Sequence, residues 1–189
     1  ATVNVTVDSF PTPTIVVNPT DTICIGESVT LSTGTFNNYS WSNNSTNGSI
    51  TVSPASQQAY GVTVTDNNGC LGTASKSIFV NNLPAASVST AKQTMCVGQS
   101  DTITAFGGVS YLWGTGSTSN QIIVNPTDTT TYNVTITDGE GCQATRQITI
   151  VVNPLPSPTA SSSDSKICFG DTTYLYASGG LNYQWNNSL

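Results

Sequence analysis

Cysteine is the residue type whose spacing in this chain most plainly implies chemistry. Cys24, Cys96 and Cys168 stand 72 residues apart, and Cys70 and Cys142 repeat the same interval. The chain has no histidine and no Cys-x-x-Cys pair, so the ligand pattern of a structural zinc site is missing. Regularly spaced cysteines in such a chain predict disulfide bonds, which form in oxidising compartments. We expect neither a metal nor a cofactor.

Other residue types that could act in catalysis are few, and they stand in turns. The lack of histidine removes the commonest general base. Asp66, Asp138 and Glu140 belong to Asp-Asn-Asn-Gly and Asp-Gly-Glu-Gly sequences, which are typical of hairpin turns. Such a turn offers too few oxygen ligands to bind calcium by itself. We therefore expect no enzymatic activity.

The composition indicates a polar but weakly charged surface. Charged residues make up 7% of the chain, against about 25% in an average soluble domain. The formal net charge is −6, so a basic patch for nucleic acid is not expected. No stretch reaches the roughly 18 consecutive apolar residues of a membrane span. These features favour an extracellular protein with neither nucleic-acid binding nor membrane insertion.

The 72-residue interval extends well beyond the cysteines. Other residues that repeat it include Trp41, Trp113 and Trp185, Gly26, Gly98 and Gly170, and the pairs Tyr60/Tyr132 and Pro54/Pro126. A fixed period of this length is typical of an array of one structural unit. The sequence predicts the last strand of a preceding repeat over 1–10, two repeats over 11–83 and 84–155, and the first strands of a truncated repeat over 156–189.

Each repeat alternates apolar and polar residues with the period of a β-strand. In the middle repeat we expect strands over 86–96, 101–106, 109–114, 121–125, 131–138 and 143–153. Short strands separated by regular turns, with a tryptophan on the third strand, favour an all-β immunoglobulin-like sandwich. Trp41, Trp113 and Trp185 are expected in the hydrophobic cores. Tyr60 and Tyr132 are expected there too, each forming a tyrosine corner.

The cysteines have more than one possible pairing within this fold. Cys24–Cys70 and Cys96–Cys142 would lie inside the repeats, whereas Cys24–Cys142 would join consecutive repeats and leave Cys70, Cys96 and Cys168 to pair outside this sequence. In the sandwich, Cys96 and Cys142 are expected at opposite ends of an eleven-residue strand, roughly 30 Å apart at ~3.3 Å per residue. A disulfide requires Cα atoms within about 7 Å. Geometry thus favours the inter-repeat bond, with intra-repeat pairing and free thiols as the alternatives.

The repeat carries a distinctive motif that resembles a known family. It runs Cys-x-Gly, then Tyr-x-Trp, then Tyr-x-Val-x-Val/Ile-Thr-Asp-x-x-Gly-Cys, the last part at 60–70 and 132–142. Over essentially the whole chain, this pattern resembles the immunoglobulin-like and PKD-like repeats of giant Bacteroidetes surface proteins, including SprB-type gliding adhesins. The resemblance implies type IX secretion, display on the bacterial cell surface, and contact with outer-membrane secretion or motility machinery through other regions.

The same resemblance implies O-glycosylation at Asp-Ser/Thr followed by a small or aliphatic residue. Four threonines of this chain meet that pattern: Thr22, Thr102, Thr129 and Thr172. Aspartate and threonine are also ordinary residues of turns and strand ends, so a chance match is the alternative.

The expected function is structural. Tight proline-containing joints and paired cysteines suit the shaft of a surface adhesin or filament, which holds a distal tip away from the cell and transmits force, with surface attachment or gliding motility as its use. Its partners would be neighbouring repeats of the same chain. One alternative is an array that binds extracellular polysaccharide, for which the Asn- and Ser-rich stretch 37–48 is the candidate contact. Another is a set of accessory repeats of a secreted enzyme.

Overall fold

The structure is a computed structural model that describes residues 2–186. The regular structure of these residues is entirely β. The strands are β1 (Val16–Asn18), β2 (Thr22–Cys24), β3 (Val29–Ser32), β4 (Asn38–Trp41), β5 (Ser49–Val52), β6 (Gln58–Thr65), β7 (Leu71–Asn81), β8 (Ser87–Thr90), β9 (Thr94–Cys96), β10 (Asp101–Phe106), β11 (Ser110–Trp113), β12 (Gln121–Val124), β13 (Thr130–Thr137), β14 (Gln143–Asn153), β15 (Thr159–Ser162) and β16 (Leu175–Ser178). Over these residues, no helix is long and apolar enough to cross a membrane.

The first sandwich packs the three-stranded sheet β1-β3-β5 against the four-stranded sheet β2-β7-β6-β4. Alternate residues of its strands point inward, as the two-residue period predicts. Its buried core consists of Ile23, Val29, Leu31, Trp41, Ile50, Val52, Tyr60, Val62, Val64 and Ile78. The Trp41 side chain is only 2% exposed and belongs to the core.

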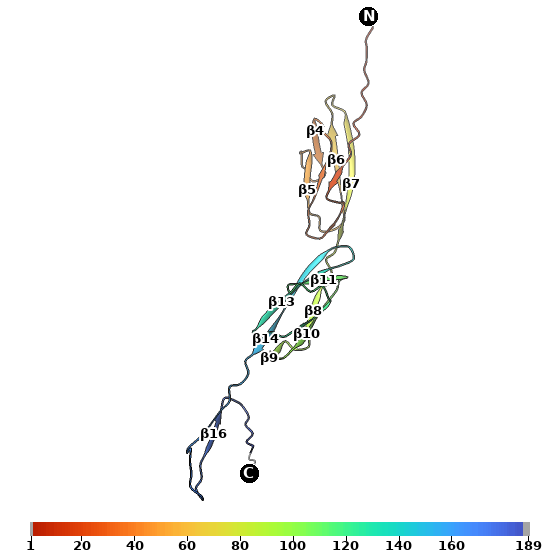
Figure 1. The fold of residues 1–189 in the computed structure, drawn as a ribbon. Coiled ribbons are helices and arrows are strands. Elements are labelled where there is room, and N and C mark those ends of the chain that lie inside the picture. The colour runs from red at the N-terminus through yellow and green to blue at the C-terminus, as the bar shows by residue number, and fades with distance from the viewer. Residues whose placement is uncertain (1, 187–189) are drawn as a thin grey trace.

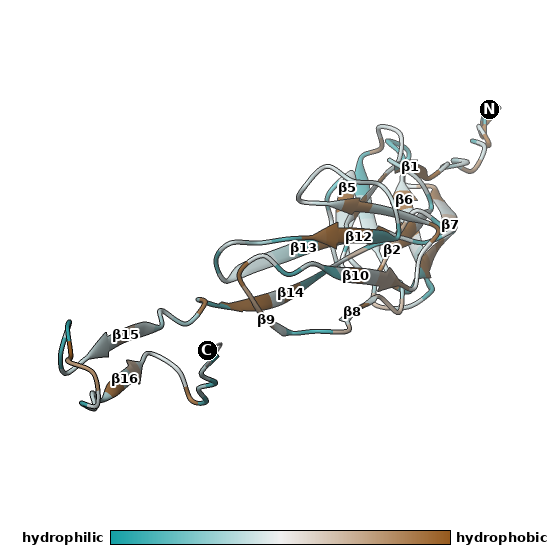
Figure 2. Cartoon of the chain, turned by 60° about the horizontal axis from the view of Figure 1, so that its bottom comes forward, coloured by the Kyte–Doolittle hydropathy of each residue, from teal (hydrophilic) through white to brown (hydrophobic). Residues whose placement is uncertain are grey.

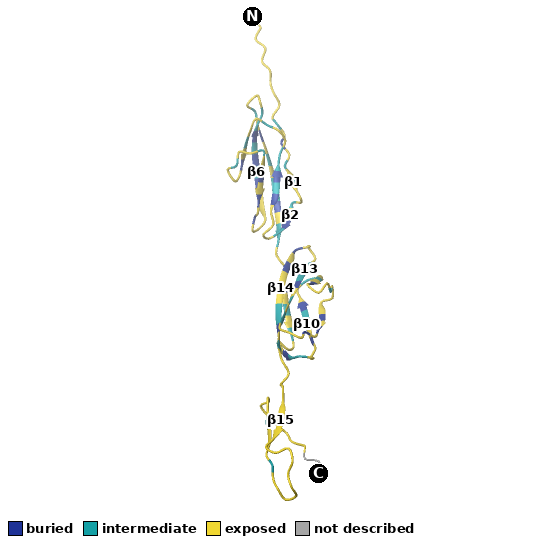
Figure 3. Cartoon of the chain, turned by 60° about the vertical axis from the view of Figure 1, so that its left-hand side comes forward, coloured by how far each residue is buried: buried dark blue, intermediate teal, exposed yellow. Residues whose placement is uncertain are grey.

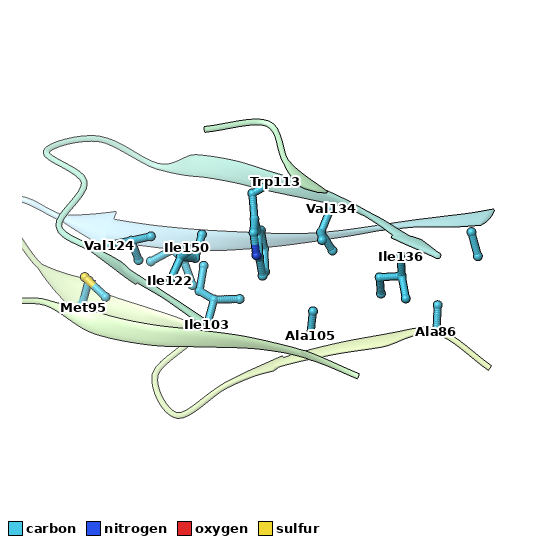
Figure 4. Packing of buried hydrophobic residues seen from close by; sticks show 11 residues of the cluster. Ala86, Met95, Ile103, Ala105, Trp113, Ile122, Val124, Val134, Ile136 and Ile150 are labelled. Atoms are coloured by element: carbon cyan, nitrogen blue, oxygen red, sulfur yellow. The ribbon is translucent and has the colours of Figure 1, made fainter. Parts of the chain in front are cut away.

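The second sandwich repeats this arrangement, with sheets β12-β10-β8 and β11-β13-β14-β9. Its buried core consists of Ala86, Met95, Ile103, Ala105, Trp113, Ile122, Val124, Val134, Ile136, Ala144 and Ile150. Figure 4 shows these side chains pointing into the space between the two sheets. Brown, hydrophobic residues concentrate on strands such as β5, β12 and β14 in Figure 2. The prediction of an all-β, immunoglobulin-like sandwich is confirmed.

The first strand of each sandwich is divided between the two sheets, which differs from the single strand expected over 86–96. β8 pairs antiparallel with β10 in one sheet, whereas β9 pairs parallel with β14 in the other. The crossing is held by Asp101, whose carboxylate accepts hydrogen bonds from the Thr90 hydroxyl and from the Lys92 backbone N–H. The first sandwich divides β1 and β2 between its sheets in the same way.

The expected tyrosine corners are not formed. A tyrosine corner needs a hydroxyl bonded to the backbone a few residues upstream. The Tyr60 hydroxyl instead donates to the side-chain Oε1 of Gln58, 3.3 Å away. Tyr60 is buried in the core, but Tyr132 is only half-buried at its edge. Burial raises the pKa of both hydroxyls.

The two ends of the described chain form no sandwich. Residues 2–10 adopt no strand, because no described strand pairs with them. Near the other end β15 and β16 make only a two-stranded hairpin. Trp185 is 47% exposed, so its expected place in a core is wrong for this structure: no second sheet among residues 2–186 covers it. Residues 1 and 187–189 of the first and last predicted segments lie outside the described part.

The two sandwiches follow one another end to end, and the hairpin lies beyond the second one (Figure 1). Buried residues gather in the two sandwiches, while the hairpin is almost wholly exposed (Figure 3). Residues 2–186 therefore contain one junction at which two complete sandwiches meet.

Candidate functional site: the bridged junction

A disulfide bond joins the two sandwiches across their junction. It links Cys24, the last residue of β2, to Cys142, which directly precedes β14. The two Cα atoms are 5.6 Å apart, and the cysteines are separated by 118 residues in sequence. Of the cysteine pairings that the sequence left open, the structure contains the one between consecutive repeats.

The two cysteines of one repeat lie at opposite ends of its longest strand. In the sheet, Cys96 lies opposite Asn153, the last residue of β14. Cys142 directly precedes Gln143, the first residue of the same strand. In the first sandwich, Cys24 likewise pairs with Asn81 at the end of β7, and Cys70 precedes its start. Each of these strands has 11 residues, or roughly 35 Å at ~3.3 Å per residue. A bond inside either repeat would have to span that strand.

A tight turn holds Cys24 in place. The Cys24 backbone N–H donates to Oε2 of Glu27 at 2.9 Å, and the Glu27 N–H donates back to the Cys24 carbonyl oxygen at 3.0 Å. Gly26 between them has φ +93°, a conformation that glycine adopts without steric cost. The reciprocal bonds fix both the direction and the position of the cysteine.

The same turn recurs at the other two Cys-x-Gly motifs. There the cysteine N–H is bound by Gln99 Oε1 at 3.0 Å or by Asp171 Oδ2 at 3.2 Å. The sequence analysis predicted no role in these turns for Glu27, Gln99 or Asp171. A signal was present, since a side chain that can accept a hydrogen bond follows each Cys-x-Gly at the same interval.

Cys142 is held by the turn before β14. Oδ1 of Asp138 accepts hydrogen bonds from the backbone N–H groups of Cys142, at 2.8 Å, and of Glu140, at 3.1 Å. The Asp138 N–H donates to the Cys142 carbonyl oxygen at 3.0 Å. Asp66 binds Cys70 in the same way in the first repeat, with its Oδ1 2.8 Å from the Cys70 N–H. Each bridge partner is therefore held in position by a turn of its own repeat.

The main chain crosses the junction beside the bridge. The Ile25 N–H donates to the Asn81 carbonyl oxygen at 2.9 Å, which ties the Cys24 turn to the end of β7. Residues 82–86 then lead into the second sandwich, where Pro84 is buried. Nε of Arg146 donates to the Ala86 carbonyl oxygen at 2.9 Å and fastens the incoming chain to β14. Two covalent connections thus run in parallel between the sandwiches.

The remaining cysteines, Cys70, Cys96 and Cys168, are free thiols in this structure. Burial raises the pKa of the Cys70 thiol, and the negative charges of Asp66 and Asp8 raise it further. Over residues 2–186, no group of three or more His, Cys, Asp or Glu side chains is gathered where it could hold a metal ion.

The loop proposed as a partner contact is tied to the core. Nε1 of Trp41 donates to the Asn47 carbonyl oxygen at 2.8 Å, and the Trp41 N–H bonds the Ser45 carbonyl oxygen at the same distance. In the second repeat Nε1 of Trp113 holds the Ser119 carbonyl oxygen at 2.8 Å. The buried tryptophans therefore fix the loops that follow them.

All four candidate glycosylation threonines, Thr22, Thr102, Thr129 and Thr172, are exposed. The neighbouring aspartates all have hydrogen-bonding partners: Asp171 accepts from the Cys168 N–H and Asp128 from the Thr127 hydroxyl. Asp21 forms an ion pair with Lys76 at 2.8 Å, and this hydrogen-bonded ammonium lowers the pKa of the carboxyl. Asp101 is only 9% exposed and holds the strand crossing described above. Burial alone would raise the Asp101 pKa, but hydrogen bonds from Thr90, Lys92 and Thr102 outweigh it and leave the pKa lowered.

Comparison with known proteins finds solved structures that resemble this chain only distantly. No family model and no curated protein matches the sequence. Fibronectin(III)-like modules of Clostridium thermocellum CbhA match 75% of this chain and 94% of theirs, at 12% identity and TM-score 0.37. The receptor-bound C-terminal fragment of intimin matches 81% of this chain and 67% of its own length, at 14% identity and TM-score 0.42. A Ca2+-stabilised adhesin with which an Antarctic bacterium binds ice matches 81% of this chain and 52% of its own length, at 16% identity and TM-score 0.40. Such low values carry no argument about function.

Proposed function

We propose that this chain is part of the structural shaft of a secreted surface adhesin or filament, and that it is not an enzyme. The observation that carries the proposal is the Cys24–Cys142 bond between consecutive sandwiches. A shaft must keep its length and direction, so its joints matter more than any one surface. Here a covalent bond reinforces the joint.

The bridge limits bending by adding a second connection. A single linker allows two domains to rotate relative to each other about the backbone bonds of the linker. In this chain the linker and the disulfide both cross the junction, and the Cys24 turn is bonded to the end of β7. Pro84 restricts φ in the linker itself. Two connections at separate points resist rotations that either one alone would permit.

The site of action that we propose is the bacterial cell surface. The motif resemblance to Bacteroidetes surface repeats supports export by type IX secretion, and a disulfide suits an oxidising compartment. Regions beyond this sequence would contact the outer-membrane secretion or gliding machinery. In a longer array of such repeats, Cys70, Cys96 and Cys168 would form equivalent bridges with neighbouring repeats.

We also propose O-glycosylation at the four exposed threonines, Thr22, Thr102, Thr129 and Thr172. Their exposure supports this proposal, since a glycosyltransferase could reach them without unfolding the strands. Intact-mass measurement of protein isolated from its native host tests it. Added hexose masses that disappear with Thr→Ala variants are expected, while an unmodified polypeptide mass would contradict the assignment.

Imaging tests the shaft directly. Electron micrographs of the protein should show straight particles with roughly 35–40 Å per sandwich, the length of an eleven-residue strand. The Cys24→Ser/Cys142→Ser variant should show a broader distribution of angles at the junction, whereas Cys70→Ser/Cys96→Ser, which leaves this bridge intact, should not. Equally broad angles in the unaltered protein would rule out a stiff shaft. Specific binding in a glycan array would then favour a polysaccharide-binding role.

A further inference from the structure

We propose that the Cys24–Cys142 bond carries tension past the bodies of both sandwiches, so that residues 25–141 stay unloaded when the chain is pulled from its ends. This inference deepens the proposed shaft function and rests on it for its biological use. Its physical basis is the connectivity of the chain. A force applied at the two ends follows the shortest covalent route, and that route leaves the backbone at Cys24 and re-enters it at Cys142.

In the first sandwich the loaded segment is 11–24. Pro11 lies against Gly72 near the start of β7, where a Cβ atom on Gly72 would come within 2.0 Å of the Pro11 carbonyl oxygen. Cys24 lies opposite Asn81 at the end of β7. The segment therefore runs the length of the sandwich. It has few residues to spare, so peeling it away from β3 and β7 would lengthen the molecule only slightly.

In the second sandwich the loaded segment is β14. Tension enters at Cys142, immediately before Gln143, and leaves at Asn153. A β-strand is already close to its maximum extension at ~3.3 Å per residue. Pulling on both ends of β14 therefore tightens this strand without shearing it from its neighbours. The antiparallel partner β13 and the parallel partner β9 stay in register.

The bypassed part contains most of both folds. It includes β3 to β13, the linker 82–86, and the buried side chains of Trp41 and Trp113. The bridged cysteines are 118 residues apart, and an unfolded chain of that length extends to about 400 Å. The bond removes this hidden length from the pulled molecule. A shaft built in this way transmits force with little stretch.

The linker itself is no longer needed to keep the two sandwiches covalently connected. Asn82 and Leu83 are exposed and lie between the bridged cysteines. A protease that cuts there breaks one connection and leaves the disulfide as the other. The structure thus predicts that a nicked junction still bears tension until a reductant is added.

Single-molecule pulling on the whole chain, held at its two ends, tests the inference. Cys70, Cys96 and Cys168 are first replaced by serine to prevent exchange, and mass spectrometry verifies the Cys24–Cys142 bond. We expect less than about 100 Å of unfolding extension in the oxidised protein, most of it from the hairpin β15–β16, which lies outside the bridged segment. After reduction, or in the variant that also carries Cys24→Ser/Cys142→Ser, two steps should together add on the order of 400 Å.

A protease site inserted between Asn82 and Leu83 gives a second readout that does not depend on the serine variants folding well. The cleaved, oxidised tether should survive pulling, and reductant should release it. Large unfolding steps in the oxidised molecule, or rupture of the cleaved tether before reduction, would overturn the inference. These failures differ from failure of the shaft proposal, which would appear as freely bending particles whose oxidised extension remains short.

Discussion

The carboxylate of Asp138 and the backbone N–H of Cys142 are hydrogen-bonded, with 2.8 Å between Oδ1 and the nitrogen. This contact sets the position of the cysteine that bridges the two sandwiches. We predict that Asp138→Ala weakens the bridge, because the turn before β14 then samples other conformations. A hydrogen bond to a charged group contributes about 1.5–3 kcal/mol, so the thiol–disulfide equilibrium should shift toward the thiols by about tenfold or more. Titration with a glutathione redox buffer measures it.

Asp66→Ala is the matched control for that variant. It removes the same contact at Cys70, whose thiol is free in this structure. The Cys24–Cys142 equilibrium should therefore be unchanged. An equal shift in both variants would mean that the effect comes from general loosening of the repeats.

Loss of the bridge should lower thermal stability. Each repeat is small for a β-sandwich, and small domains bury too little surface to be robust alone. Removing a native disulfide from such a domain typically costs about 2–5 kcal/mol. Calorimetry of Cys24→Ser/Cys142→Ser should show this loss, together with unfolding of the two sandwiches as separate transitions. Cys70→Ser/Cys96→Ser should retain the Tm of the unaltered protein; a comparable loss there would contradict a specific role for the bridge.

Gly72→Ala should destabilise the first sandwich, because its new Cβ would clash with the Pro11 backbone. Overpacking of this kind costs about 1–3 kcal/mol. Gly61→Ala on the adjacent strand is the control, since the nearest atom to its Cβ, the Ala74 carbonyl oxygen, is 3.7 Å away. Denaturant unfolding measures both. Similar midpoints for the two variants would show that the chain enters the sandwich differently.

Asp101 should make the second sandwich sensitive to acid. Its pKa is lowered in the folded protein, since hydrogen bonds to the carboxylate outweigh the effect of burial. A carboxyl of this kind stabilises the fold above the unfolded-state pKa of about 3.9, and its contribution is lost as pH falls through the lower folded-state value. Asp101→Asn should thus lower Tm at pH 7 and flatten the decline of Tm below about pH 4. The exposed Asp128→Asn variant should leave that decline unchanged, and identical pH profiles for both variants would refute the assignment.

Much of the fold could be predicted from local pattern. The predicted ranges 101–106 and 143–153 coincide with β10 and β14. The alternation of apolar and polar residues predicts the bounds of these strands, because one face of each strand is buried and the same pattern recurs every 72 residues. The junction geometry followed from the same pattern, since a long strand necessarily separates the residues at its two ends.

Other features depend on contacts that no local pattern encodes. Asp101 occupies the position of the buried Val29 in the first repeat, and only the nearby Thr90 hydroxyl and Lys92 backbone make a carboxylate acceptable there. Trp185 repeats the interval of Trp41, yet its burial requires a facing sheet that residues 2–186 do not supply. The Tyr60 hydroxyl found a side-chain acceptor in place of the expected backbone one. In each case the outcome depends on a partner distant in sequence or on side-chain geometry.

Disulfide mapping after trypsin digestion tests most directly whether consecutive sandwiches are covalently locked. The four basic residues, Lys76, Lys92, Arg146 and Lys166, place Cys24 and Cys70 in peptide 1–76, and Cys96 and Cys142 in peptide 93–146. With thiols blocked and no reductant, these two peptides should appear as one linked species that reduction separates. Bonds inside each repeat would leave them unlinked, and that result would contradict the locked junction on which the shaft depends.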